Sequence, residues 1–307
     1  MRSTASLRLG DIDFLNSWPV TYALRKGIVS TDIRMVHGTP AELNRRLLTG
    51  ELDASAVSSL AYLRHSDEFV PIPDLCIRSD QTVHSVIVVS RQPLTTLKGR
   101  TIGVSNQGAT TPILLKLVAA RRNLKINLEV THLRYPEILE EYPAALLIGD
   151  EALSASQSSD NLQWWDLGEA WTSWTKKPFV YALWVVRRQL VDRQPEVLSR
   201  LQEILMSSYE WSGSHEEELV AAMREEFPFE VNFLKQYLKA ISYDLDAKAW
   251  EGLVRFAKEA EAAGELARGT VRRLRKPASS VCAEVLSAIR HESWRSGSVL
   301  LSGGEAR

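Results

Sequence analysis

The sequence contains few of the residues from which disulfide and zinc frameworks are built. Among its 307 residues there are two cysteines, Cys76 and Cys282, and neither has another Cys or a His at metal-ligand spacing. A disulfide framework is therefore excluded, and a structural zinc site is not expected. Isolated thiols of this kind are typical of a reducing compartment.

An excess of one charge and long apolar runs are also missing. Lys and Arg together number 37 against 38 for Asp and Glu, so no net charge attracts nucleic acid or an anionic membrane. No stretch approaches the ~20 apolar residues of a membrane helix, and the N-terminus has no apolar run that could form a signal-peptide core. We therefore expect a cytoplasmic protein with a small-molecule ligand, while the oligomeric state stays open.

Common catalytic motifs are absent as well. The sequence has no Gly-x-Ser-x-Gly elbow, no Walker loop and no His-Glu-x-x-His, and Gly103 and Gly108 do not fit the dinucleotide-binding spacing. The six histidines are scattered, and an isolated histidine is more often an ordinary packed or surface residue. The motifs of common hydrolase, nucleotide-binding and metalloprotease sites are thus not present.

The pattern that is present is a repeated unit of strand, polar turn and helix. Strands are predicted at 7–14, 53–57, 101–104 and 144–148, and each precedes a polar turn and a helical pattern. Such alternation is typical of an α/β fold with open, mostly parallel sheets. The length suits two lobes. We expect residues 1–88 and 185–307, the latter with the C-terminal helices, to form lobe 1, and residues 89–184 to form lobe 2.

One helix has an especially clear start. Thr39 is followed by Pro40 at the first helical position and by Glu42 three residues after the threonine, which is a capping box. Gly50 ends the pattern. The sequence therefore predicts a helix that begins at Pro40.

Four polar turns follow predicted strands: Asn16–Ser17, Ser58–Ser59, the 105–110 loop and the turn at Asp150. In open α/β sheets, ligands bind beyond the carboxyl ends of the strands, where helix N-termini can hold an anion. We expect a cleft between the lobes at these turns. Ser, Thr, Asn and Asp are also the preferred N-cap residues, so each turn could instead serve only to cap its helix. Asp150 is expected to be such a cap.

Several short motifs, in their order along the chain, resemble the chorismate dehydratases of the futalosine route to menaquinone. The resemblance covers about residues 7–188 and is weaker in the C-terminal helices. Gly108 stands where the family often has Ser, and His84 stands where a smaller residue is common. The motifs are Leu15-Asn16-x-x-Pro19, GTPAELNRRLLTGELDASAVSSLAY (38–62), Ser79-Asp80, Ser85-Val86, Ser105-x-Gln107-x-Ala109-Thr110, LLIGDEAL (146–153) and LGEAWTSWTKKPFVYALWVVRR (167–188).

This resemblance implies a two-lobed fold of the type II periplasmic-binding-protein kind, used as an enzyme with its site in the cleft between the lobes. It also implies a lyase reaction that removes water from chorismate and gives 3-[(1-carboxyvinyl)oxy]benzoate. Chorismate carries two carboxylates, which suits helix N-termini on both lobes. Because the product ring is aromatic, the elimination needs no redox cofactor or metal, and none is expected.

The resemblance points to Asn16 as the catalytic contact. The proton could be taken by the enolpyruvyl carboxylate of the substrate itself or by Asp150, and the sequence leaves both open. Two other functions also stay open: a non-enzymatic small-carboxylate-binding protein, and the sister enzyme 1,4-dihydroxy-6-naphthoate synthase, whose first turn typically reads differently. The candidate substrate-binding residues are Ser17, Ser58, Ser59, Ser85, Ser105, Gln107, Ala109, Thr110 and Asp150.

Overall fold

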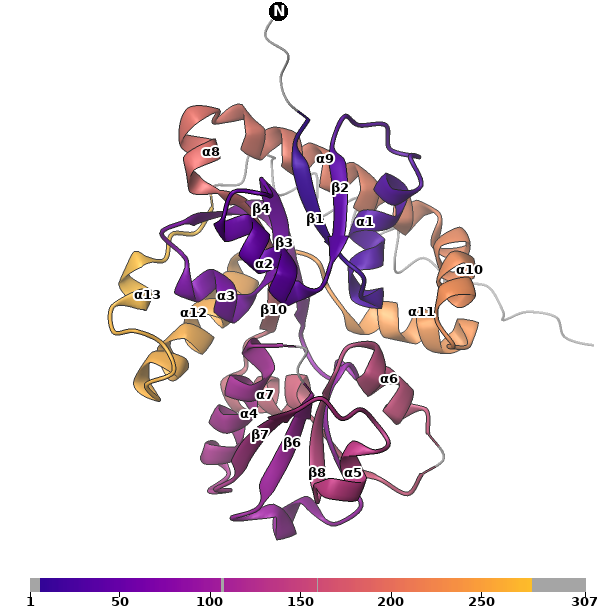
Figure 1. Ribbon diagram of the computed structural model, residues 1–307, viewed down its shortest axis with the longest axis vertical. Helices are drawn as coiled ribbons and strands as arrows, with labels where there is room; N and C mark the ends of the chain where they lie inside the picture. The colour runs from indigo at the N-terminus through magenta and orange to yellow at the C-terminus, as the bar shows by residue number, and fades with distance from the viewer. Residues whose placement is uncertain (1–5, 106–107, 159, 278–307) are drawn as a thin grey trace, which may run out of the picture.

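The computed structural model describes residues 6–105, 108–158 and 160–277. It has two five-stranded sheets, each flanked by helices, which lie one above the other in Figure 1. We call the first sheet with its helices the first lobe, and the second sheet with its helices the second lobe. The predicted two-lobed α/β fold is confirmed.

The first sheet combines four strands from the first 80 residues with one strand, β10, that comes much later in the chain. Its order is β2-β1-β3-β10-β4, in which β2–β1 and β1–β3 pair in parallel while β10 is antiparallel to both β3 and β4. The strands are β1 (Arg8–Ile12), β2 (Arg34–Gly38), β3 (Ala54–Ser58), β4 (Phe69–Ser79) and β10 (Phe179–Arg187).

The second sheet repeats this arrangement. Its order is β7-β6-β8-β5-β9, with β6 parallel to β7 and β8, and with β5 antiparallel to β8 and β9. The strands are β5 (Val86–Ser90), β6 (Thr101–Ser105), β7 (Asn127–Thr131), β8 (Ala144–Ile148) and β9 (Gln163–Asp166).

In each sheet one strand runs against the other four, so both sheets are mixed and the prediction of mostly parallel sheets is confirmed. In each sheet the antiparallel strand, β10 or β5, is the one that follows a crossing from the other lobe. Buried strands on either kind of ladder read as continuous apolar runs, so the sequence pattern located these strands without revealing their direction.

Short helices connect the strands, and the clearest prediction among them is confirmed. Thr39 precedes α2, and its Oγ1 accepts a hydrogen bond from the Glu42 backbone N–H at 3.3 Å. Before the C-terminal region the structure has η1 (Leu15–Ser17), α1 (Trp18–Arg25), α2 (Pro40–Leu48), α3 (Ser59–Arg64), η2 (Leu94–Leu97), α4 (Thr110–Arg121), α5 (Ile138–Glu141), α6 (Asp150–Ser156) and α7 (Leu167–Thr175).

The C-terminal helices pack largely on the first lobe (Figure 1). The Tyr22 ring on α1 stacks against the Trp211 ring on α9 with centroids 5.7 Å apart. No described helix is long and apolar enough to cross a membrane. The helices are α8 (Arg188–Arg193), α9 (Glu196–Ser214), α10 (Glu216–Glu226), α11 (Val231–Ala240), α12 (Ala247–Ala262) and α13 (Thr270–Arg273).

The domain limits at 88/89 and 184/185 stay a prediction. Each limit falls inside a strand: 88/89 lies within β5 and 184/185 lies within β10. Both strands pair only within one sheet, β5 in the second and β10 in the first.

Candidate functional site

The turn after β1 contains two polar residues with different roles, Asn16 and Ser17. The Ser17 hydroxyl is buried and lies 2.6 Å from the carbonyl oxygen of Ile12 and 2.8 Å from that of Phe14, to which it can donate. Asn16 is partly buried in the 3₁₀ turn η1, and its side-chain amide has no hydrogen bond to any residue that the structure describes. Ser17 therefore holds the turn, while the Asn16 amide can bind a ligand.

At the start of α3, both predicted hydroxyls have partners within the protein. The Ser58 hydroxyl caps the helix, accepting from the Ala61 backbone N–H at 3.4 Å. The Ser59 hydroxyl is fully buried and donates to the carbonyl oxygen of Val180 on β10 at 2.5 Å. For Ser58 the capping interpretation is thus correct, and Ser59 joins the helix start to the sheet.

The start of α4 is different, because it contains buried hydroxyls without partners. Ser105 Oγ, at the end of β6, and Thr111 Oγ1, in the first turn of α4, are buried and have no hydrogen-bond partner among the described residues. A cap residue with a side-chain hydrogen bond is also missing there, since the N-cap position is Ala109, which is exposed. Unpaired buried polar groups are costly and commonly mark a ligand site. Gln107 lies outside the described residues.

Thr110 joins the two lobes directly. Its Oγ1 accepts a hydrogen bond at 2.9 Å from the backbone N–H of Leu60 in the first turn of α3. The N-terminal turns of α3 and α4 are therefore in contact across the lobe junction.

Asp150 also reaches across the junction, and the prediction that it caps α6 is wrong. The N-cap is Gly149, whose φ of 64° suits glycine, and Asp150 is the first helical residue. From that position its Oδ1 accepts from the Leu15 backbone N–H at 3.3 Å. Burial raises the pKa of Asp150 to about 6, and the nearby Asp13 carboxylate adds to the rise.

The C-terminal region contributes two tyrosines that the sequence analysis missed. The Tyr243 hydroxyl donates to the Asn16 carbonyl oxygen at 2.9 Å. Tyr237 on α11 has a buried hydroxyl that lies near Ser85. Burial raises its pKa, Ser85 partly offsets that rise and Asp150 adds to it. Ser85 is itself buried, and its carbonyl oxygen accepts from the Gly149 N–H at 2.7 Å.

Two of the predicted site residues, Thr110 and Asp150, thus make hydrogen bonds across the lobe junction. Within the described residues, no three His, Cys, Asp or Glu side chains are grouped closely enough to hold a metal ion. The chemical groups at the junction instead include an amide, hydroxyls, helix N-termini and the Asp150 carboxylate of raised pKa.

Known proteins resemble this chain in sequence and in fold. A family model described as menaquinone biosynthesis matches residues 7–262. The chain belongs to the menaquinone biosynthesis family. Among relatives, it is 30% identical to the chorismate dehydratase of Thermus thermophilus over 207 residues, which are 59% of this chain and 75% of that one. It is 28% identical over 274 residues to the 1,4-dihydroxy-6-naphtoate synthase of the same organism, covering 84% of this chain and 95% of that one.

Solved structures add evidence on the fold of this family member. The periplasmic aliphatic sulphonate binding protein of Escherichia coli superposes with a TM-score of 0.64, over 91% of this chain and 95% of that chain. The sequence identity is 11%, so this likeness concerns the fold alone. The predicted periplasmic-binding-protein-like fold and the predicted family of menaquinone-biosynthesis enzymes are both confirmed.

Proposed function

We propose that this protein removes water from chorismate to give 3-[(1-carboxyvinyl)oxy]benzoate, the first step of the futalosine route to menaquinone. The observation that carries the proposal is the contact between Leu15 N–H and Asp150 Oδ1, which brings the Asn16 turn against the start of α6. The family match and the chorismate dehydratase relative support the substrate.

The start of α4 suits one of the two carboxylates of chorismate. A helix N-terminus presents unpaired N–H groups and about half a positive charge to an anion. The hydroxyls of Ser105 and Thr111 are buried beside it, have no partner in the part of the chain that the structure describes, and can donate to a carboxylate oxygen. In this proposal a substrate carboxylate accepts hydrogen bonds from these hydroxyls and from the N–H groups of the helix start.

Asn16 provides the catalytic contact in this proposal. Its amide hydrogen-bonds the departing C4 hydroxyl or holds the enolpyruvyl group, while the substrate is oriented for loss of the C3 proton. Orientation of this kind can lower a barrier by several kcal/mol, on the order of 7 for well-aligned groups. The elimination makes the ring aromatic, so the reaction has a strong driving force and involves no change of redox state.

Two groups are candidates for the base that takes the C3 proton. The first is the enolpyruvyl carboxylate of the substrate, which lies on the same molecule. The second is Asp150, whose raised pKa of about 6 suits a base that works near neutral pH. The Asp150→Asn variant considered in the Discussion separates the two.

The sister reaction is the second candidate function. It is favoured by the longer alignment with the 1,4-dihydroxy-6-naphtoate synthase, although the identity there is lower. A protein that binds small carboxylates without converting them is the third possibility, since the same fold serves solute binding.

Incubation of the purified protein with chorismate tests the proposal. We expect formation of the enolpyruvyl benzoate, and at least a hundredfold lower kcat for Asn16→Ala, because the catalytic amide is lost. The matched control is Asn232→Ala, which removes an exposed amide on α11 and should keep full turnover. Full turnover by Asn16→Ala at saturating chorismate would disprove the role of Asn16. Chorismate that is bound but left intact would favour the binding-protein function.

A further inference from the structure

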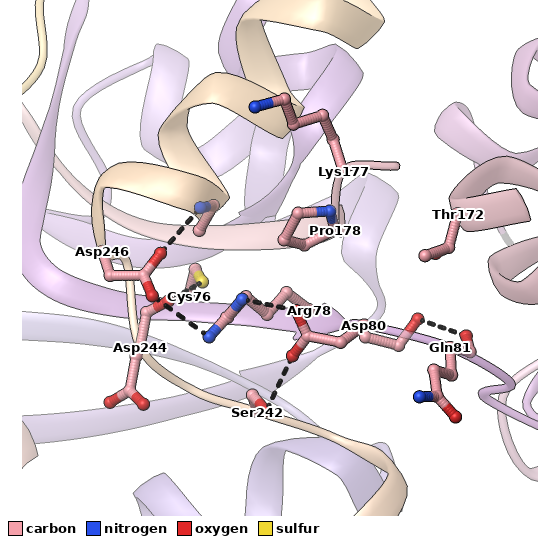
Figure 2. Close-up of polar contacts among 12 residues, drawn as sticks. Cys76, Arg78, Asp80, Gln81, Thr172, Lys177, Pro178, Ser242, Asp244 and Asp246 are labelled. Carbon is pink, nitrogen blue, oxygen red and sulfur yellow. Dashed lines mark hydrogen bonds and ion pairs between the residues drawn. The ribbon is translucent and has the colours of Figure 1, made fainter. Parts of the chain in front are cut away.

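A segment far along the chain from Asn16 is fixed beside it. Residues 241–246 connect α11 to α12 and run along β4 of the first sheet. Figure 2 shows Ser242, Asp244 and Asp246 of this segment around Arg78 of β4. We call residues 241–246 the 241–246 segment.

Main-chain hydrogen bonds attach this segment to β4. Arg78 and Ser242 exchange two of them, each 2.9 Å long, and the Cys76 N–H donates to the Tyr243 carbonyl oxygen at 2.8 Å. The Cys76 thiol adds a contact with the Asp244 carbonyl oxygen at 3.3 Å. The backbone of Tyr243 is therefore held as if it were part of the sheet.

The Arg78 side chain strengthens the attachment (Figure 2). Its guanidinium is mostly buried and bonds Asp80 Oδ1 at 2.8 Å and Asp246 Oδ2 at 3.3 Å. The other oxygen of Asp246 accepts from the Ala249 N–H at 2.7 Å and so caps α12. Ser242 Oγ lies 3.5 Å from Asp80 Oδ2. One buried cation thus ties β4, the 241–246 segment and α12 together.

From this fixed backbone, the Tyr243 side chain reaches the Asn16 turn. Its ring packs on the Tyr209 ring with centroids 5.1 Å apart, and its hydroxyl donates to the Asn16 carbonyl oxygen at 2.9 Å. Burial raises the pKa of the Tyr243 phenol well above its usual range, so the hydroxyl keeps its proton.

The other supports of the Asn16 turn come from the first lobe itself, where the Ser17 hydroxyl bonds the carbonyl oxygens of Ile12 and Phe14, and from the second lobe. The turn is a single 3₁₀ turn of three residues, closed by the Ser17 N–H to the Phe14 carbonyl oxygen at 2.9 Å. On its second-lobe side it contacts Asp150 through Leu15 N–H. The turn is bonded to the C-terminal region through the Tyr243 hydroxyl, which donates to the Asn16 carbonyl oxygen.

We propose that Tyr243 is a positioning residue that holds Asn16 in its catalytic orientation, with the 241–246 segment and Arg78 as its anchor. This inference rests on the proposed function of Asn16. It gives the C-terminal helices a role in the reaction, and it gives the motif at Ser79-Asp80, which adjoins Arg78, a role in supporting that anchor.

Tyr243→Phe tests the proposal, with Tyr209→Phe as the matched control that removes a hydroxyl from the same ring pair. We expect kcat for chorismate to fall about tenfold in Tyr243→Phe while KM stays within about twofold, because orientation and not affinity is lost. Tyr209→Phe should keep the kcat of the unaltered protein. An unchanged kcat in both variants, or an equal fall of kcat in both, would overturn the proposal.

Hydrogen exchange supplies a readout that does not depend on turnover. We expect the backbone amides of Ser17 and Trp18 to exchange about fivefold faster in Tyr243→Phe than in Tyr209→Phe, since one hydrogen bond to the turn is lost. Unchanged exchange would contradict the proposal. If the unaltered protein does not convert chorismate, the proposed function fails, and the exchange arm still decides whether Tyr243 holds the turn.

Discussion

The hydroxyls that face the lobe junction differ between the two lobes. In the first lobe, those of Ser17, Ser58 and Ser59 bond to backbone groups of the same lobe. In the second lobe, the Thr110 hydroxyl accepts from the Leu60 N–H of the first lobe, whereas those of Ser105 and Thr111 are buried with no hydrogen-bond partner among the described residues.

This difference separates two uses of the same residue types. A satisfied hydroxyl stabilises its turn, whereas a buried unsatisfied one costs stability unless a ligand completes it. The second lobe also contains Asp150, a partly buried carboxylate whose one hydrogen-bond donor among the described residues is Leu15 N–H. We infer that the second lobe gives up stability to bind the substrate, while the first lobe presents Asn16 from a well-supported turn.

The largest effect is expected at Asp150. Its folded pKa of about 6 lies above the ordinary 3.8, so its stabilising contribution is complete below about pH 4 and is lost as pH rises through 6. At pH 7 the buried charge costs about 3 kcal/mol. Asp150→Asn should therefore raise the free energy of unfolding by about 2 to 3 kcal/mol at pH 7 and leave it unchanged at pH 4, as measured by urea denaturation.

The matched control for this measurement is Asp192→Asn, which removes an exposed carboxylate on α8 and should shift neither value. A loss of stability at pH 7 in Asp150→Asn would contradict the comparison between the lobes.

The same variant also tests whether Asp150 is the base that takes the C3 proton. If Asp150 takes the proton, kcat/KM rises with pH through about 6 and Asp150→Asn loses turnover. If the substrate carboxylate takes it, the variant retains turnover.

Local sequence patterns were sufficient to predict the parts of the fold that depend on neighbours along the chain. The capping box at Thr39 and the strand that became β6 follow from cap chemistry and apolar periodicity, which act over a few residues. The reversed direction of β10 and of β5 did not follow, because buried parallel and antiparallel strands have similar composition.

The candidate site was predictable in outline only. Polar turns after strands pointed to Asn16 and Ser105, but caps and ligand contacts use the same residues, and only the structure separates Ser58 from Ser105. Thr111 directly follows the predicted 105–110 loop and was not among the candidate residues. Tyr237 and Tyr243 could not be found, because more than two hundred residues separate them from Asn16 and tyrosines in amphipathic segments usually belong to the core.

A smaller effect, of opposite sign, is expected at Ser59. Ser59→Ala removes a fully buried hydrogen bond to the Val180 carbonyl oxygen, which should cost about 1 to 3 kcal/mol of unfolding free energy. Because this hydroxyl is already used within the protein, KM for chorismate should change by less than about threefold. Calorimetry and steady-state kinetics on one preparation measure both values. A stable variant with a strongly raised KM would show that Ser59 binds the substrate directly.

The matching change in the second lobe is Ser105→Ala, and its effect on stability should be the smallest. Ser59 and Ser105 are both buried serines, but Ser105 Oγ has no partner among the described residues, so its removal leaves no protein group unpaired. We expect unfolding free energy to stay the same or to rise by up to about 1 kcal/mol. KM for chorismate should instead rise about tenfold or more, because a charge-assisted hydrogen bond to a substrate carboxylate is lost. If Ser105→Ala destabilised the protein as much as Ser59→Ala and left KM unchanged, the hydroxyls of the two lobes would have the same role, and the assignment of the α4 start as the carboxylate site would be wrong.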